Sequence, residues 1–289
     1  MPPWFENEPL TRELRFVRTE DDPDARPRLI VWSVGDHYHL QYADGTQFLV
    51  DNAATRVWAT WPRETLTLED TATYLLGPIM GFVLLLRGFI SLHACAVAVD
   101  DRAIAIVGPA GSGKSTTAAA FADRGFSILA EDVVTLQDRG ASFLVQPGYP
   151  SIRLWPSSVE ALYGATATLP KLTPTWDKCY LDLTQEKYEF QQHPLPLSAI
   201  YLLGERQAHG PIVGDVVPAE RLMSLVANTY ATYLMDKTMR AREFEILGRV
   251  LESVPVRRVT PHSDPARIGE LCRTLIEDFG CITSQPMER

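Results

Sequence analysis

The stretch Gly108-Pro109-Ala110-Gly111-Ser112-Gly113-Lys114-Ser115 decides the fold, because it matches the full phosphate-binding pattern G-x-x-x-x-G-K-[ST]. Ahead of it, residues 103–107 form a short, continuous apolar run that predicts a buried strand. Behind it, residues 116–124 are rich in alanine and predict a helix, which Gly125 ends. A glycine-rich turn that matched by chance would lack this order of strand, loop and helix. The sequence therefore predicts a phosphate-binding loop in an α/β fold.

The residues of this loop predict contacts with a nucleotide. Its amides and the helix N-terminus face one point, where unpaired N–H groups and the helix dipole favour an anion. We expect Lys114 to reach the β- and γ-phosphates and the Ser115 hydroxyl to bind Mg²⁺. The other expected nucleotide contacts are Gly108, Ala110, Gly111, Ser112, Gly113 and Thr116. The predicted cofactors are therefore ATP and Mg²⁺.

Composition narrows the class of protein. The chain has 289 residues, of which 46% are hydrophobic and 22% charged, as in an ordinary globular protein. A net charge of -9 without clustered Lys and Arg argues against nucleic acid as a partner. The first 20 residues lack the apolar core of a signal peptide, and no C-x-x-C pair occurs, which predicts a cytoplasmic protein with reduced thiols. The four cysteines are Cys95, Cys179, Cys272 and Cys281.

Two regions are expected. Residues 1–66 predict an N-terminal β-rich region, in which residues 29–50 form a meander, and residues 67–289 predict the nucleotide-binding domain. His37 and His39 alternate along one predicted strand and could in principle bind a metal. Because no third ligand accompanies them, we favour a structural pair.

An apolar segment follows the meander. Thr67-Leu68-Glu69-Asp70 has the form of a capping box and predicts a helix that runs toward Arg87 with a kink at Pro78. Residues 74–90 are the longest apolar stretch, but Gly77-Pro78 and Arg87 interrupt it. We therefore expect a buried core helix and no membrane span.

An acidic pair follows the strand predicted at residues 126–130. Strands that run parallel deliver the side chains at their carboxyl ends to one edge of a sheet, so Glu131-Asp132 should lie near the phosphate loop. Two carboxylates there can divide two tasks, in which one holds Mg²⁺ and the other accepts a proton from an attacking hydroxyl. An acidic pair that only opens a turn is the alternative. His93 lies on the strand predicted at residues 91–99, and taken alone it is more typical of a structural histidine.

Further candidates and elements come later in the chain. Arg153 either neutralises phosphate charge or lies over Trp155. Lys178 is a weaker candidate contact, in a loop of a length that often closes over a substrate. The sequence after Lys178 predicts helices at 219–239, 241–252 and 264–279, with strands at 199–203 and 255–260.

Three segments together resemble the HPr kinase/phosphorylase family, and more distantly the ATP-dependent phosphoenolpyruvate carboxykinases. They are Ser91-Leu92-His93, the loop at 108–115 and Ala130-Glu131-Asp132, within residues 88–155. The resemblance implies an α/β fold with an HPr-kinase-like P-loop core on a mixed sheet, joined here to the N-terminal β-meander. By this resemblance, His93 becomes a site residue beside the acidic pair. With Lys114 from the loop and Arg153 from the chain that follows, the predicted catalytic residues are His93, Lys114, Glu131, Asp132 and Arg153. Glu131 or Asp132 would be the base, and Ser115 with Asp132 would seat Mg²⁺.

The sequence departs from that family at places that bear on the predicted substrate. The glycine-arginine-asparagine segment of the bifunctional enzymes is missing, so phosphorylase activity and HPr as substrate are not implied. Pro147-Gly148-Tyr149-Pro150 and Leu154-Trp155 resemble the stand-alone HPr-kinase-like proteins of peptide-modification systems. Some of these, the lasso peptide kinases, phosphorylate a serine near the C-terminus of a precursor peptide.

We therefore predict a serine kinase whose acceptor is a peptide or small protein. Two alternatives remain open, namely a small-molecule or carboxykinase-like phosphotransferase and a nucleotide switch that hydrolyses ATP slowly and recruits a partner. HPr kinases assemble into rings, so a homo-oligomer is among the partners that the resemblance allows, although the segments that build those rings differ here.

Overall fold

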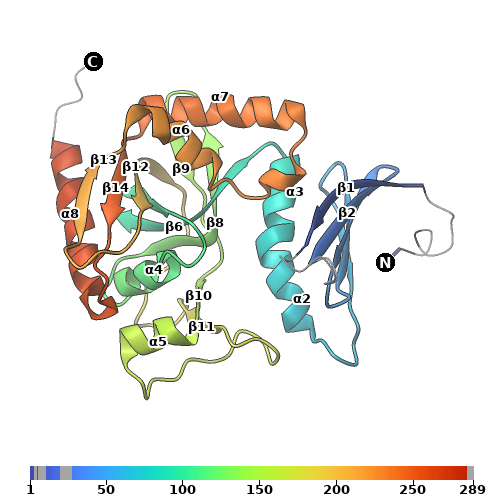
Figure 1. The fold of residues 1–289 in the computed structure, drawn as a ribbon, viewed down its shortest axis with the longest axis horizontal. Helices are drawn as coiled ribbons and strands as arrows, with labels where there is room; N and C mark the ends of the chain where they lie inside the picture. The colour runs from blue at the N-terminus through green and yellow to red at the C-terminus, as the bar shows by residue number, and fades with distance from the viewer. Residues whose placement is uncertain (3–4, 6–10, 20–27, 285–289) are drawn as a thin grey trace. The chain divides into compact units, whose positions relative to one another are not determined.

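The computed structural model describes residues 1, 2, 5, 11–19 and 28–284, and its fold class is α/β (Figure 1). Contacts divide the chain into two compact units. The first comprises Met1–Phe89, Thr173–Trp176 and Ala231–Met239, and the second comprises Ile90–Leu172, Asp177–Tyr230 and Arg240–Arg289. This division falls at Phe89, whereas the sequence predicts a boundary at residue 66. The helical segment after Thr67 therefore belongs to the first unit and not to the nucleotide-binding unit.

The sheet of the first unit is a five-stranded antiparallel meander, as the sequence predicts for residues 29–50. Its strands are β1 (Arg12–Arg18), β2 (Leu29–Val34), β3 (His37–Tyr42), β4 (Gln47–Asp51) and β5 (Val57–Thr60). His39 is buried, its Nε2 lies 2.9 Å from Gln47 Oε1, and its ring stacks on Trp32. His37 instead lies beside the ring of Trp58. The two histidines thus have the structural roles that we favoured.

The helical segment of the first unit begins at a capping box, as predicted. The Thr67 hydroxyl accepts a hydrogen bond from the Asp70 amide, and the Asp70 carboxylate accepts one from the Thr67 amide. The segment comprises α2 (Leu68–Tyr74), the π-helical turn η1 (Leu75–Ile79) and α3 (Met80–Leu86). The π turn contains Pro78, which lacks the amide that a regular helix would use.

By length and composition, the segment Leu68–Leu86 could cross a membrane, but half of it is buried inside the protein. Tyr74 stacks on Tyr42 of the meander, and Phe82 meets Tyr38 edge to face. These contacts are those of the core helix that the sequence predicts.

The second unit is built on a seven-stranded mixed sheet in the order β13-β14-β12-β7-β6-β8-β9. Strands β14, β12 and β7 run parallel, and the other neighbours pair antiparallel. The bounds are β6 (Ile90–Val99), β7 (Arg102–Val107), β8 (Ile128–Asp138), β9 (Phe143–Val145), β12 (Leu195–Leu203), β13 (Ile212–Asp215) and β14 (Val256–Thr260). A separate two-stranded ribbon consists of β10 (Ser151–Leu154) and β11 (Cys179–Asp182).

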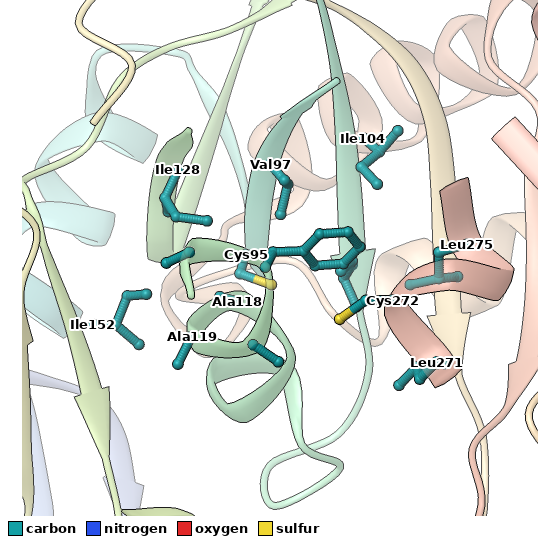
Figure 2. Packing of buried hydrophobic residues seen from close by; sticks show 14 of the residues in the cluster. Cys95, Val97, Ile104, Ala118, Ala119, Ile128, Ile152, Leu271, Cys272 and Leu275 are labelled. Carbon is teal, nitrogen blue, oxygen red and sulfur yellow. The ribbon is translucent and has the colours of Figure 1, made fainter. Parts of the chain in front are cut away.

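Helices cover both faces of this sheet (Figure 1). One face packs against α4 (Lys114–Ala122) and α8 (Ile268–Ser284), and the other against α6 (Pro218–Val226) and α7 (Lys237–Ser253). Figure 2 shows Cys95 and Val97 of β6 facing the helix residues Ala118 and Cys272. The remaining helical elements are α5 (Pro156–Tyr163) and the 3₁₀ turns η2 (Thr232–Leu234) and η3 (Pro265–Arg267).

Two predicted elements differ from those observed. The strand expected to end at Ala130 continues through the acidic pair, so β8 is one long strand that pairs with β6. The helix predicted at 219–239 is also wrong, because α6 ends at Val226. Just beyond it, Asn228 Nδ2 and Thr229 Oγ1 donate to carbonyl oxygens of the last helical turns, which ends the helix, and residue 229 then bridges to β6.

Candidate functional site

The phosphate loop leaves β7 at Gly108 and enters α4 at Lys114. Gly111 and Gly113 have φ angles of 79° and 105°, a left-handed region that favours glycine. A Cβ atom at Gly113 would lie 2.9 Å from Arg206 Nη2, so this glycine also makes room for the guanidinium. The Ser112 hydroxyl is buried and has no hydrogen-bond partner in the described part of the chain. An unpartnered hydroxyl with a guanidinium close by is suited to a phosphate group.

Lys114 and Thr116 show how the loop is arranged. Lys114 Nζ donates to the carbonyl oxygens of Gly108 at 2.7 Å and Pro109 at 3.0 Å, so the ammonium lies over the loop. Burial lowers the pKa of Lys114, and the carboxylates at the site partly oppose that effect. The Thr116 hydroxyl lies 2.9 Å from that of Ser158, so in this conformation it faces α5.

Glu131 is the acidic residue next to the loop. The Ser115 hydroxyl donates to Glu131 Oε1 at 2.6 Å, and the Arg153 amide lies 3.4 Å from Oε2. Glu131 is only 7% exposed, and burial, with the charge of Asp132 second, raises its pKa to about 7. The sequence predicts that Asp132 shares a cation with Ser115, but the structure pairs Ser115 with Glu131.

Asp132 has a different set of neighbours. Its Oδ1 lies 3.5 Å from His93 Nε2, and its Oδ2 lies 3.6 Å from Arg153 Nη1 and 3.2 Å from the Tyr230 hydroxyl. Consecutive side chains of a regular strand point to opposite faces, yet both acids lie at this site. The left-handed φ of 71° at Asp132 is the local departure from strand geometry at the pair. Backbone strain of this kind is typical of functional sites.

The register explains why these groups meet. Glu131 pairs with Cys95, which in turn pairs with Ile106, so Glu131 lies level with the penultimate residue of β7. Strand β8 runs in the same direction as β7, with β6 between them. The carboxyl end of β7 and the acidic pair therefore share one edge of the sheet, as the sequence predicts.

His93, Arg153 and Lys178 complete the predicted set. Burial, and next the charge of Lys114, lower the pKa of His93, so its imidazole is neutral at pH 7. The Arg153 guanidinium lies 5.3 Å from the ring centre of Tyr149, not over Trp155. Lys178 Nζ lies 4.9 Å from the ring centre of Trp155 instead, and its charge contributes to lowering the pKa of His93.

Sequence reasoning missed two residues, Arg206 and Tyr230. Arg206 follows the carboxyl end of β12, which is parallel to β7, and that position was a signal for it. Together with Gly113, it lines a cavity beside the loop, which Pro261, His262 and Asp264 close on the other side. Tyr230 gave no signal, because it falls in a segment predicted as a helix.

Comparisons with known proteins add little to this geometry. No protein-family model and no curated protein matches the chain. Among solved structures, the chain is similar to the Hpr(Ser) kinase/phosphatase from Coxiella burnetii, with 13% sequence identity, a TM-score of 0.35, and coverage of 68% of this chain and 99% of that chain. At that TM-score the likeness supports no assignment of function, which has to come from the site itself.

Proposed function

We propose that the chain is a Mg²⁺-dependent kinase that transfers the γ-phosphoryl group of ATP to a serine hydroxyl of a peptide or small protein. One observation carries this proposal. A phosphate loop and two carboxylates with different surroundings meet at one edge of the sheet, where Glu131 contacts Ser115 and Asp132 lies beside His93. Such an arrangement supplies a phosphate site and a proton acceptor together.

The loop and its neighbours suit a nucleoside triphosphate. The N-terminus of α4 at Lys114 suits phosphate oxygens, and Lys114 Nζ can exchange its two carbonyl partners for them. Arg206, which lies beside Gly113, supplies a second positive charge next to the loop for the phosphate chain.

Ser115 and Glu131 would hold Mg²⁺, because a hydroxyl and a carboxylate are the hard oxygen ligands that this ion prefers. Bound there, the ion would offset charge on the β- and γ-phosphates. The described part of the chain has no cluster of three or more His, Cys, Asp or Glu side chains suited to a metal. That fits an ion held by one or two protein oxygens, phosphates and water.

Asp132 would act as the base, because its side chain is 19% exposed whereas Glu131 is buried. The acceptor oxygen would form a bond to the γ-phosphorus, the bond from that phosphorus to the β–γ bridging oxygen would break, and the hydroxyl proton would pass to Asp132. The products are ADP and a phosphoserine. Arg153 and Lys114 would offset the charge of the transferring group, so that positioning and electrostatics supply most of the acceleration.

The peptide acceptor, including a lasso-type precursor peptide, rests on the resemblance stated above and on one surface feature. Trp155 is 54% exposed, and Lys178 lies over its ring. Lys178 is also close enough to the catalytic groups to affect the pKa of Lys114. An exposed aromatic ring beside a catalytic site is suited to contact with a peptide chain.

Incubation with γ-³²P-labelled ATP and a panel of serine peptides tests the proposal. Label in a peptide supports it, label in free phosphate alone indicates a nucleotide switch, and label in an added small-molecule acceptor indicates the small-molecule alternative. Lys114→Ala should abolish transfer. Lys187→Ala is the matched control, because that lysine pairs with Asp123 at the other end of α4, and it should transfer at the wild-type rate. Full transfer by a folded Lys114→Ala protein would refute the proposal.

A further inference from the structure

Tyr230 contacts two groups of the candidate site. Its hydroxyl donates to Asp132 Oδ2 at 3.2 Å, and its ring meets the His93 ring edge to face, with centroids 5.8 Å apart. Arg153 Nη1 approaches the same carboxylate oxygen at 3.6 Å. Oδ2 therefore accepts a hydrogen bond from Tyr230 and lies in an ion pair with Arg153, whereas the contact of Oδ1 is with His93 Nε2 at 3.5 Å.

Backbone pairing holds Tyr230 in this place. Strand β7 pairs with β6 only from Ala94 onward, so residues 90–93 of β6 extend beyond β7 on that side. The segment at 228–230 takes up this free edge. His93 N donates to Asn228 O at 2.7 Å, and Tyr230 N donates to Ser91 O at 2.7 Å. The segment thus forms an antiparallel bridge to β6 at residue 229, beside the end of β7.

Left-handed backbone occurs at Asp132 and at the residue that follows Tyr230. Asp132 has a φ of 71°, and Ala231, directly after the tyrosine, has a φ of 56°. Neither is a glycine, and such conformations persist where the surrounding structure fixes them. The hydrogen bond therefore joins two segments whose backbones are held in uncommon geometry.

We propose that Tyr230 is a positioning residue for the proton acceptor: its hydroxyl holds Oδ2 of Asp132, so that Oδ1 is turned to the acceptor hydroxyl. This inference rests on the proposed kinase function and deepens it. Tyr230 acts through Asp132, because its described contacts at the site are with Asp132 and His93 and not with the phosphate loop. Loss of its hydroxyl should therefore slow the chemical step and leave nucleotide binding unchanged.

Tyr230→Phe isolates this role, because it keeps the ring and the backbone pairing and removes only the hydroxyl. Under single-turnover conditions we expect the rate constant of transfer to fall about tenfold, the loss that a hydrogen bond to a charged group would give. The Kd of Mg·ATP and the Tm should stay at their wild-type values. The matched control is Tyr188→Phe, whose hydroxyl donates to Asp123 at the far end of α4, and it should transfer at the wild-type rate.

The outcomes separate this inference from the function on which it rests. A wild-type protein that binds Mg·ATP and transfers phosphate to no acceptor refutes the proposed function, and the inference with it. An active wild type with a Tyr230→Phe rate within twofold overturns the inference alone. A change in Tyr230→Phe confined to the Kd of Mg·ATP, or a fall in its Tm that accounts for the lost rate, also overturns it, because either would show a binding or structural role.

Discussion

Replacing Glu131 by Gln should make the stability of the protein less dependent on pH. Burial raises the pKa of Glu131 from 4.5 to about 7. Between these values the folded protein keeps a proton that the unfolded chain has lost, so the free energy of unfolding falls as the pH rises. Each pH unit between these two values changes the free energy of unfolding by about 1.4 kcal/mol, so the whole loss is on the order of 3 kcal/mol. A glutamine side chain is neutral at every pH, so the variant does not lose this unfolding free energy as the pH rises.

Urea unfolding at pH 5 and pH 8 measures the effect. The stability of the variant relative to wild type should be about 2 to 3 kcal/mol greater at pH 8 than at pH 5. Glu189→Gln is the matched control, because Glu189 also accepts a hydrogen bond from a serine but lies at the surface. Its difference from wild type should be the same at both pH values.

Equal differences for Glu131→Gln at the two pH values would refute the reasoning, since they would show that folding does not raise the pKa of this carboxyl. The same variant should lose phosphate transfer, because a glutamine cannot supply the carboxylate for Mg²⁺. A gain in stability with a loss of activity is the usual sign that a residue is kept for function.

Three further predictions follow from the site and the core. Binding of Mg·ATP, measured by calorimetry, should tighten about tenfold from pH 5.5 to pH 6.5 and level off above pH 8, because Glu131 has to lose its proton before it can bind Mg²⁺. An affinity that does not change with pH would contradict the assignment of Glu131 as a Mg²⁺ ligand. Gly113→Ala should weaken nucleotide binding at least about tenfold, since the new Cβ would meet Arg206 in a left-handed backbone, and unchanged affinity in a fluorescence titration would show that the loop is not the binding site. Phe121→Ala, in the core between the sheet and α8, should lower the free energy of unfolding by about 3 to 5 kcal/mol, and a loss below about 1 kcal/mol in urea would mean that the packing is looser than described.

Short sequence patterns predicted much of the secondary structure. The strand before Gly108 follows from a short apolar run, and the alanine-rich helix after it and the capping box at Thr67 follow from patterns whose hydrogen bonds are made within a few residues. The meander was predictable in the same way, from turn residues between apolar runs. Local rules were sufficient wherever local contacts decide the structure.

Distant contacts decide the rest of the site. The segment at 228–230 pairs with β6 because that strand offers a free edge more than 130 residues earlier in the chain, and no pattern around Tyr230 predicts this pairing. The division of labour between Glu131 and Asp132 likewise depends on the left-handed backbone at Asp132 and on which acid meets Ser115. Pairing between remote strands sets both features, so sequence alone left them open.

The structure of the protein with Mg²⁺ and a non-hydrolysable ATP analogue would test the central claim most directly. We predict the phosphates within the loop at 108–115, Mg²⁺ about 2.1 Å from Ser115 Oγ with Glu131 as a ligand or one water away, and the γ-phosphate facing Asp132. An analogue outside the loop, or an ion on Asp132 with Ser115 still bonded to Glu131, would contradict it.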